Sequence, residues 1–164
     1  TMIDVGKPLG LTVVGSEANH VLRVEKGFLS LGHEVDGTVD PIDLGMSWIL
    51  SKNKADYLGK RAVMLRRASG RPRRELVGLL PEDPVKLVVE GAPITPQGKR
   101  QASEGFVSAC VWSVVAQRSV ALGLLTNGRA RQGETVFIRM KDEVVRATVT
   151  APCFYDPKGA ILRG

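Results

Sequence analysis

The sequence predicts an α+β protein in which a mixed helix-and-strand region, residues 1–70, precedes a small antiparallel β-barrel, residues 71–164. Near residue 70 the composition changes to short apolar segments separated by Gly, Pro and Asn. Ser69–Pro72 marks the boundary, because Gly and Pro discourage the continuation of a helix. Five or six short antiparallel strands within roughly 90 residues typically close into a barrel or a sandwich.

The first predicted element is a helix that is capped by Ser16 and ends near Lys26, with Gly27 as the stop. Its apolar positions 18, 21 and 22 have i, i+3, i+4 spacing and share one face. Glu25 continues this stripe, so it either finds a hydrogen-bonding partner in the interior or reaches water at a frayed helix end. Arg23 lies off the stripe and is expected to be free to point at a ligand or at solvent.

The helix is followed by a segment in which two strands flank a loop. Phe28–Leu31 is predicted to be a strand, and His33–Asp43 an acidic loop that lacks the ligand spacing of a calcium-binding loop. Asp40–Pro41 predicts a helix N-terminus, since Asp caps a helix and Pro has its φ already set. Met46–Leu50 is predicted to be a buried strand, which places Trp48 in the core.

A second helix is predicted from Leu58, Ala62 and Leu65, with Asp56 near its cap. It overlaps a basic segment, Arg61–Arg74, which contains six arginines and no acidic residue. This segment is either a polyanion-binding site or a solvated connector between two lobes. It contains no aromatic residue on which single-stranded nucleic acid could stack.

Alternating apolar residues predict the strands of the barrel. The predicted strands are Leu76–Leu80, Phe106–Val115, Val120–Leu124 and the two arms of a hairpin, Val136–Met140 and Val145–Val149. Lys141–Glu143 is the predicted hairpin turn, and Asn127–Gly128 ends the strand before it.

Composition excludes several classes of function. The chain is 43% hydrophobic and carries a net charge of +6, and no apolar run approaches the roughly 18 to 20 residues that span a bilayer. With two cysteines and two histidines, no zinc or other metal site is predicted, and Cys110 is expected to be a buried, inert thiol. Dinucleotide, phosphate-loop and nucleophile-elbow motifs are absent from the sequence. No catalytic residue is therefore predicted, and the chain is expected to be soluble and cytoplasmic.

Four ordered elements carry a resemblance. They are Leu22–Gly27 (LRVEKG), Gly32–Glu34 (GHE), Thr38–Trp48 with its Asp-Leu-Gly, and Asp56–Arg61 (DYLGKR). Together they resemble the signature of the aminomethyltransferase family, the folate-binding T-protein of glycine cleavage and its relatives. The loop from residue 35 to residue 41 and the ending Ala151–Pro157 are most similar to one branch, the C-terminal regions of the alpha subunits of heterotetrameric sarcosine oxidases.

This resemblance implies that the chain is the tail of a folate-binding core followed by the C-terminal barrel of the family. In such an enzyme the carbon from oxidative demethylation of sarcosine passes to tetrahydrofolate and gives 5,10-methylenetetrahydrofolate. FAD, FMN and NAD would bind outside this chain, and the other sarcosine oxidase subunits would be its partners, with no membrane or nucleic acid. The family's pterin-recognising Glu and catalytic Asp precede anything that matches Thr1, so the 164 residues alone are expected to be inactive.

By motif position, the resemblance implies two tetrahydrofolate-binding residues. Arg23 is the candidate partner for the carboxylates of the folate tail, and its alternative role is a salt bridge on the helix surface. Tyr155 matches a ligand-lining Tyr, and its alternative role is ordinary packing. Three other functions stay open: a fragment of a stand-alone aminomethyltransferase, a basic barrel that binds polyanions, and a subunit-docking barrel that needs no ligand.

Overall fold

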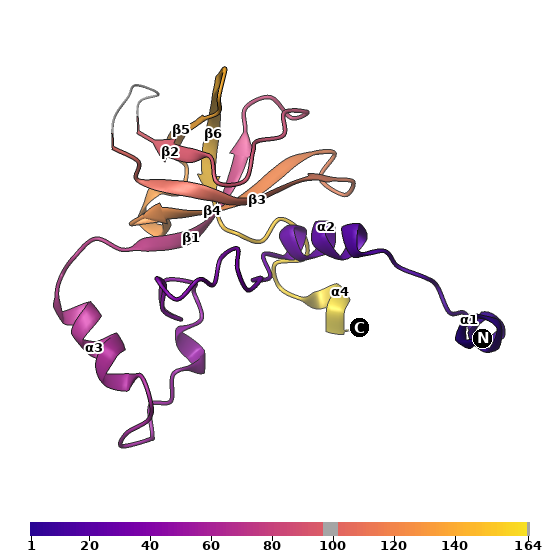
Figure 1. Cartoon of the computed structure of the whole chain (residues 1–164), viewed down its shortest axis with the longest axis horizontal. Coiled ribbons are helices and arrows are strands. Elements are labelled where there is room, and N and C mark those ends of the chain that lie inside the picture. Colours follow the sequence, from indigo (N-terminus) through magenta and orange to yellow (C-terminus); the bar gives the residue numbers. More distant parts are fainter. Residues whose placement is uncertain (97–101, 164) are drawn as a thin grey trace.

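The computed structural model describes residues 1–96 and 102–163 as a barrel with most of the helices on one side and the N-terminal helix apart from it (Figure 1). The helices are α1 (Met2–Gly6), α2 (Ser16–Lys26), α3 (Lys60–Ala68) and α4 (Ala160–Arg163). The strands are β1 (Arg74–Pro81), β2 (Pro93–Thr95), β3 (Gly105–Ser113), β4 (Arg118–Thr126), β5 (Thr135–Arg139) and β6 (Val144–Thr150). None of the helices described is long and apolar enough to cross a membrane.

The strands form a closed barrel in the order β1-β4-β3-β2-β5-β6, and β6 pairs with β1 to close it. All of these pairings are antiparallel, which confirms the predicted fold class. Strand β2 was not predicted, because three residues that begin with Pro93 are too few to show an alternating pattern. The predicted hairpin is the pair β5–β6.

The described residues form two apolar clusters, one on each side of the barrel wall. One cluster fills the barrel interior and includes Leu79, Ile94 and Ile138. The other lies between the outer face of β1, β4 and β3 and the region before residue 50, and it joins Val24 of α2 to Leu122 of β4. Strand β4 is consequently buried along almost its whole length, since both of its faces are covered.

Helix α2 has the predicted bounds, and Gly27 ends it with φ of +73°. Two details differ from the prediction. Gly15 is the N-cap, and Ser16 is the first helical residue rather than the cap. The buried face contains Val24 and Glu25, with Val21 packed beside them, and these three positions have i, i+3, i+4 spacing, whereas Leu22 is exposed.

The two strands predicted before residue 51 do not form. Phe28–Leu31 contributes only an isolated bridge between Leu31 and Val35, and Ser47–Ile49 is a turn of 3₁₀ helix. Trp48 is 77% exposed, so its predicted place in the core is wrong. The physical reason is that a closed barrel offers no free edge with which another strand could pair.

The second helix begins at a later residue than predicted. Helix α3 begins after Gly59, so Asp56 is not its cap and Leu58 lies outside it, fully exposed. None of the residues of α3 is buried. Asp40–Pro41 begins a turn rather than a helix, although Asp40 accepts hydrogen bonds from the next amides as a cap would.

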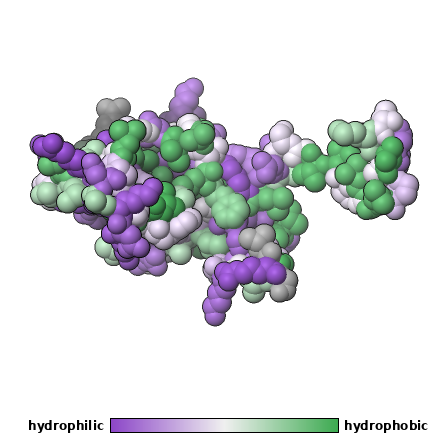
Figure 2. Space-filling view, turned by 90° about the horizontal axis from the view of Figure 1, so that it is seen from below, coloured by the Kyte–Doolittle hydropathy of each residue, from purple (hydrophilic) through white to green (hydrophobic). Residues whose placement is uncertain are grey.

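Helix α1 stands apart from the barrel at the end of an extended segment (Figure 1). Its side chains and those that follow it form a separate hydrophobic cluster in the space-filling view (Figure 2). The exposed apolar residues of this arm are Met2, Ile3, Val5, Leu9, Leu11, Val13 and Val14.

Candidate functional site

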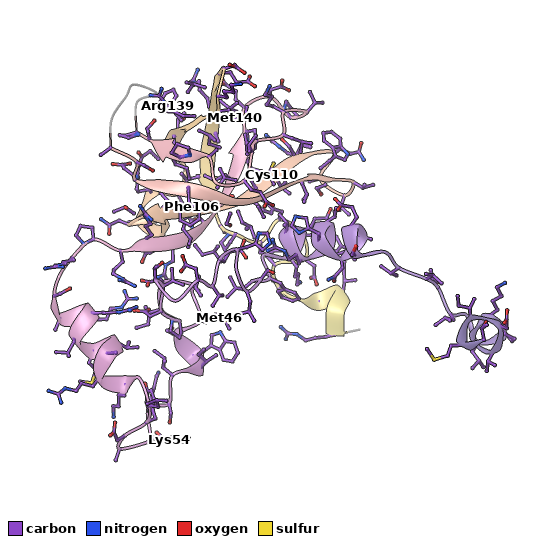
Figure 3. The ribbon with its side chains drawn as sticks, viewed as in Figure 1. Met46, Lys54, Phe106, Cys110, Arg139 and Met140 are labelled. Carbon is purple, nitrogen blue, oxygen red and sulfur yellow. The ribbon has the colours of Figure 1, made fainter. Side chains whose placement is uncertain are left out.

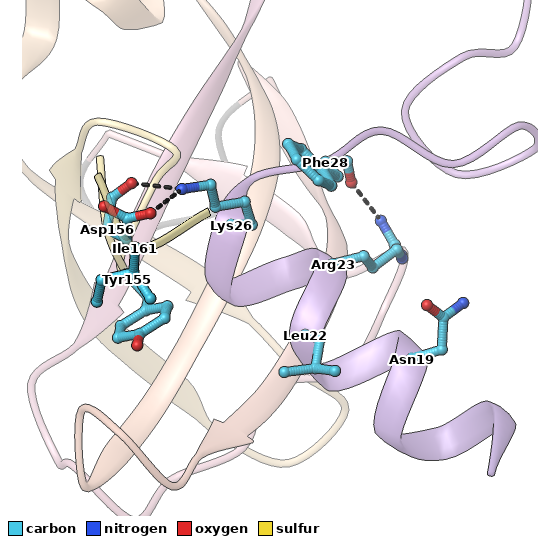
Figure 4. A pocket seen from close by; sticks show the side chains of 8 residues that line it. All are labelled: Asn19, Leu22, Arg23, Lys26, Phe28, Tyr155, Asp156 and Ile161. Carbon is cyan, nitrogen blue, oxygen red and sulfur yellow. Dashed lines mark hydrogen bonds and ion pairs between the residues drawn. The ribbon is translucent and has the colours of Figure 1, made fainter. Parts of the chain in front are cut away.

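A groove of about 300 Å³ lies between α2 and the C-terminal segment (Figure 4). It is lined by both of the candidate ligand-binding residues that the sequence singled out, Arg23 and Tyr155. The lining residues are Asn19, Leu22, Arg23, Lys26, Phe28, Tyr155, Asp156 and Ile161. Exposed apolar side chains from both segments form much of its wall, with charged groups beside them.

The end of α2 holds the C-terminal segment in place. The carbonyl oxygen of Glu25 accepts hydrogen bonds from the amides of Phe154 and Tyr155, at 2.8 and 3.0 Å. Gly27 permits this close approach, because a Cβ at this position would lie 2.4 Å from the carbonyl oxygen of Pro152. The backbone of the C-terminal segment therefore packs directly against the helix end.

An ion pair adds a second attachment between the two segments. Lys26 Nζ lies 3.0 Å from Asp156 Oδ2 and also donates to the Asp156 carbonyl oxygen. Asp156 Oδ1 accepts a hydrogen bond from the amide of Ala160, which begins α4. The short helix α4 and Tyr155 are thus fixed relative to α2, and so are the two sides of the groove.

Arg23 is held by protein groups on several sides. Its Nη1 donates to Glu34 Oε2 at 3.0 Å and to the carbonyl oxygen of Phe28 at 3.3 Å, and its Nε donates to His20 Nδ1 at 3.4 Å. The side chain is 11% exposed, so it does not point at solvent, which was one of the two expected directions; the other, toward a ligand, stays a prediction. Its Nη2 is buried and has no hydrogen-bond partner among the described residues.

Tyr155 and Arg23 line the same groove without touching. Figure 4 shows the guanidinium of Arg23 directed toward Phe28 and away from the Tyr155 ring. The Tyr155 side chain is 36% exposed and available to a ligand. Any molecule that used both residues would have to extend along α2.

Two buried glutamates lie between this region and strand β3. Glu25 is 3% exposed, and its Oε1 accepts a hydrogen bond from Ser113 Oγ at 2.6 Å. Of the two alternatives left by the sequence, the structure therefore shows the buried and hydrogen-bonded one. Glu34 is fully buried and accepts from Ser108 Oγ at 2.7 Å.

Sequence reasoning did not single out Glu34 or Ser108 as site residues. Glu34 is part of the Gly-His-Glu element that carries the resemblance, and that membership was the signal that could have identified it. Ser108 lies where the β3–β4 register shifts between Val107 and Ala109. Because such a bulge depends on strand pairing, no local pattern in the sequence reveals it.

Half of the arginines of the basic segment make internal contacts through their guanidinium groups. Arg67 Nη2 lies 2.6 Å from Asp40 Oδ1 and 2.8 Å from Asp43 Oδ1, and Arg73 donates to both oxygens of Asp43. The guanidinium carbon of Arg74 lies 5.6 Å from the centre of the Phe106 ring. Three of the six arginines therefore stabilise the fold, which weakens the polyanion-binding interpretation.

Asp43 is the centre of this ion network. Burial opposes its ionisation, but the hydrogen bond from Arg73, the Asp40 amide and the charges of Arg73 and Arg67 together lower the pKa of Asp43 below its usual value. The same contact raises the pKa of Arg73. Both groups are therefore charged at neutral pH.

Cys110 lies on β3 and packs against the cluster in the barrel interior (Figure 3). Burial raises the pKa of its thiol, with a smaller contribution from the charge of Glu90, although a hydrogen bond from the Val88 amide acts in the opposite direction. Because a raised pKa leaves little thiolate at neutral pH, the Cys110 thiol is poorly suited to nucleophilic chemistry.

Within the described residues, no group of three or more His, Cys, Asp or Glu side chains could hold a metal ion.

The chain is similar to curated proteins of two kinds. It is 36% identical over 160 residues to the sarcosine oxidase subunit alpha of Corynebacterium sp. (strain P-1), covering 94% of this chain and 16% of that protein. The corresponding subunit of Rhizobium meliloti (strain 1021) is 33% identical, with 98% and 17% covered. An aminomethyltransferase of Desulfitobacterium hafniense (strain DSM 10664 / DCB-2) is 26% identical, with 96% and 42% covered. The chain thus spans about one sixth of the length of these sarcosine oxidase subunits.

The fold also matches a solved structure. The crystal structure of glycine cleavage system aminomethyltransferase T from Bartonella henselae superposes with a TM-score of 0.78 at 23% identity, covering 94% of this chain and 45% of that one. The model of the glycine cleavage T-protein C-terminal barrel domain matches residues 74–156, just over half of the 164 residues. The model of the GCVT N-terminal domain matches residues 1–54. The predicted domain division at residue 70 stays a prediction, whereas the resemblance is confirmed: the chain belongs to the glycine cleavage T-protein family.

Proposed function

We propose that this chain is the C-terminal tetrahydrofolate-binding region of a sarcosine oxidase alpha subunit. Its identity to three such subunits is 33–37%, against 26–28% for five aminomethyltransferases. The observation that carries the proposal is the groove that Arg23 and Tyr155 line together. An oxidoreductase of this kind would be active only as the assembled enzyme.

The residues of the groove suit a folate. Arg23 Nη2 is a buried donor without a described partner, and a buried donor gains free energy when an acceptor reaches it. A guanidinium is well matched to a carboxylate such as those of the folate tail. The Tyr155 ring and the exposed Leu22 side chain would contact the aromatic part of the molecule.

In this proposal the chain binds and orients, and it supplies no catalytic residue. Tetrahydrofolate, when bound, accepts the one-carbon unit released by the oxidation and becomes 5,10-methylenetetrahydrofolate. Because the sequence carries no dinucleotide-binding motif, FAD, FMN and NAD would be bound elsewhere in the enzyme. The other sarcosine oxidase subunits would be its partners, and the location would be cytoplasmic.

The test is a titration of tetrahydrofolate into the assembled enzyme that contains this chain, with wild type and Arg23→Lys compared. Lysine keeps the charge but loses the planar fork, so we expect the Kd to rise about tenfold. Arg66→Lys, on α3 and outside the groove, is the matched control and should leave the Kd unchanged. An unchanged Kd for Arg23→Lys would show that the Arg23 guanidinium does not contribute to tetrahydrofolate binding.

The same preparation separates the proposal from a stand-alone aminomethyltransferase. A sarcosine oxidase consumes sarcosine and oxygen and releases hydrogen peroxide without a lipoamide-bound substrate. Flavin in the purified protein together with peroxide release would support the proposal. Aminomethyl transfer from lipoamide without any oxidation would contradict it.

A further inference from the structure

We propose that Glu34 is a positioning residue for Arg23 and fixes the guanidinium that binds the folate tail, an inference that rests on the proposed function. Glu34 does not line the groove, so it would act through Arg23 rather than on the ligand. The juxtaposition that carries the proposal is a fully buried carboxylate behind an arginine whose remaining nitrogen has no described partner.

Glu34 is itself held from three directions. Its Oε2 accepts from the Ser30 amide at 2.9 Å and from Arg23 Nη1 at 3.0 Å, and its Oε1 accepts from Ser108 Oγ at 2.7 Å. Both oxygens are thus engaged, and one anchor is a barrel strand. The register shift in β3 between Val107 and Ala109 places Ser108 where it reaches the carboxylate. Through Ser108, the barrel wall thereby fixes the position of the Glu34 carboxylate.

Arg23 receives its orientation from these fixed groups. Glu34 and the Phe28 carbonyl bind Nη1, and His20 binds Nε, so two of the three nitrogens are fixed. A planar guanidinium with two nitrogens fixed has its third fixed as well. Nη2 is that third nitrogen; it is buried and has no hydrogen-bond partner among the described residues, so its two N–H donors are unsatisfied. Loss of Glu34 would free the side chain to take other rotamers and weaken binding.

Glu25 provides a matched control. It is as buried as Glu34 and also accepts a hydrogen bond from a serine of β3, Ser113. Within the part of the chain that the structure describes, its carboxylate makes no hydrogen bond or ion pair with Arg23, although it lies two residues away on α2. A general effect of neutralising a buried carboxylate would appear in both Glu25→Gln and Glu34→Gln, whereas a positioning effect would appear only in the second.

The test is a double-mutant cycle on tetrahydrofolate binding by the assembled enzyme. We expect Glu34→Gln to raise the Kd about tenfold in the wild-type background and less than twofold in an Arg23→Ala background. Glu25→Gln should change the Kd less than twofold in both. Ser108→Ala, which removes one support and no charge, should act in the same direction as Glu34→Gln with a smaller effect. Equal effects of Glu34→Gln in both backgrounds would overturn the proposal.

A second measurement needs no folate. Phenylglyoxal modifies accessible guanidinium groups, and peptide mass spectrometry gives the rate at Arg23 alone. Glu34→Gln should accelerate this modification several-fold, and Glu25→Gln should not; an unchanged rate in Glu34→Gln would overturn the positioning role. A wild-type enzyme that binds no tetrahydrofolate would instead overturn the proposed function, so the two failures are distinguishable.

Discussion

The barrel and the region before residue 70 are stabilised in different ways. The barrel encloses its own apolar cluster, and every strand has two hydrogen-bonded neighbours. The earlier region contributes only α2 and part of its loop to a shared cluster, and α3 buries no residue. Ion pairs to Asp40 and Asp43 attach α3 and the segment that leads into β1. We infer that the barrel is a scaffold that positions the region before residue 70, which has no apolar core of its own among the described residues.

Truncating a barrel residue should have the largest effect on stability. Leu79 is fully buried in the barrel interior, so Leu79→Ala should lower the free energy of unfolding by about 2 to 5 kcal/mol. Urea unfolding monitored by circular dichroism measures this change. Leu58→Ala, at a fully exposed position, is the control and should have no comparable effect. Equal losses in the two variants would contradict the proposed division of roles.

Removing the centre of the ion network should have the next largest effect. Asp43→Ala removes a carboxylate that both Arg67 and Arg73 contact and leaves them only Asp40, and we expect a loss of about 2 to 3 kcal/mol, because both arginines can partly reach water. Hydrogen exchange of α3 amides should rise while exchange in β4 stays slow. If β4 exchanged faster to the same extent, the two regions would unfold as one unit.

Acid should reproduce part of this effect without a mutation. Because folding lowers the pKa of Asp43, its contribution to stability is present above the ordinary carboxyl pKa of 3.8 and is lost as pH falls through the lower folded value. We therefore expect the slope of stability against pH below about pH 4 to be smaller in Asp43→Asn than in wild type. Urea midpoints measured between pH 2 and pH 6 provide this slope, and identical slopes would contradict the assignment.

The sequence predicted the barrel better than the preceding region, and physical reasons explain this. Apolar and polar residues alternate along strands β5 and β6, because one face of each strand meets the core and the other meets water. This alternation can be read directly from the sequence. The segment Met46–Leu50 is also apolar, yet it could form a strand only if a sheet edge were free to pair with it. A local sequence pattern contains no information about free sheet edges. In the groove, the motif identified Arg23 and Tyr155, but Glu34 and Ser108 became visible only when β3 was placed beside the loop.

The smallest predicted effect concerns the contact that joins the two regions at the groove. In Gly27→Ala the new Cβ would lie 2.4 Å from the Pro152 carbonyl oxygen, and alanine is disfavoured at φ of +73°. The C-terminal segment can shift outward to relieve this contact, so we expect a loss of only about 1 to 2 kcal/mol, with Tyr155 displaced from the groove.

Gly10→Ala is the matched control, because Gly10 also has positive φ, +79°, but its Cβ would meet no atom within 4 Å. Thermal unfolding compares the two variants. Equal losses would mean that backbone strain alone acts at Gly27, whereas a larger loss at Gly27 would show that the close approach of the C-terminal segment maintains the groove.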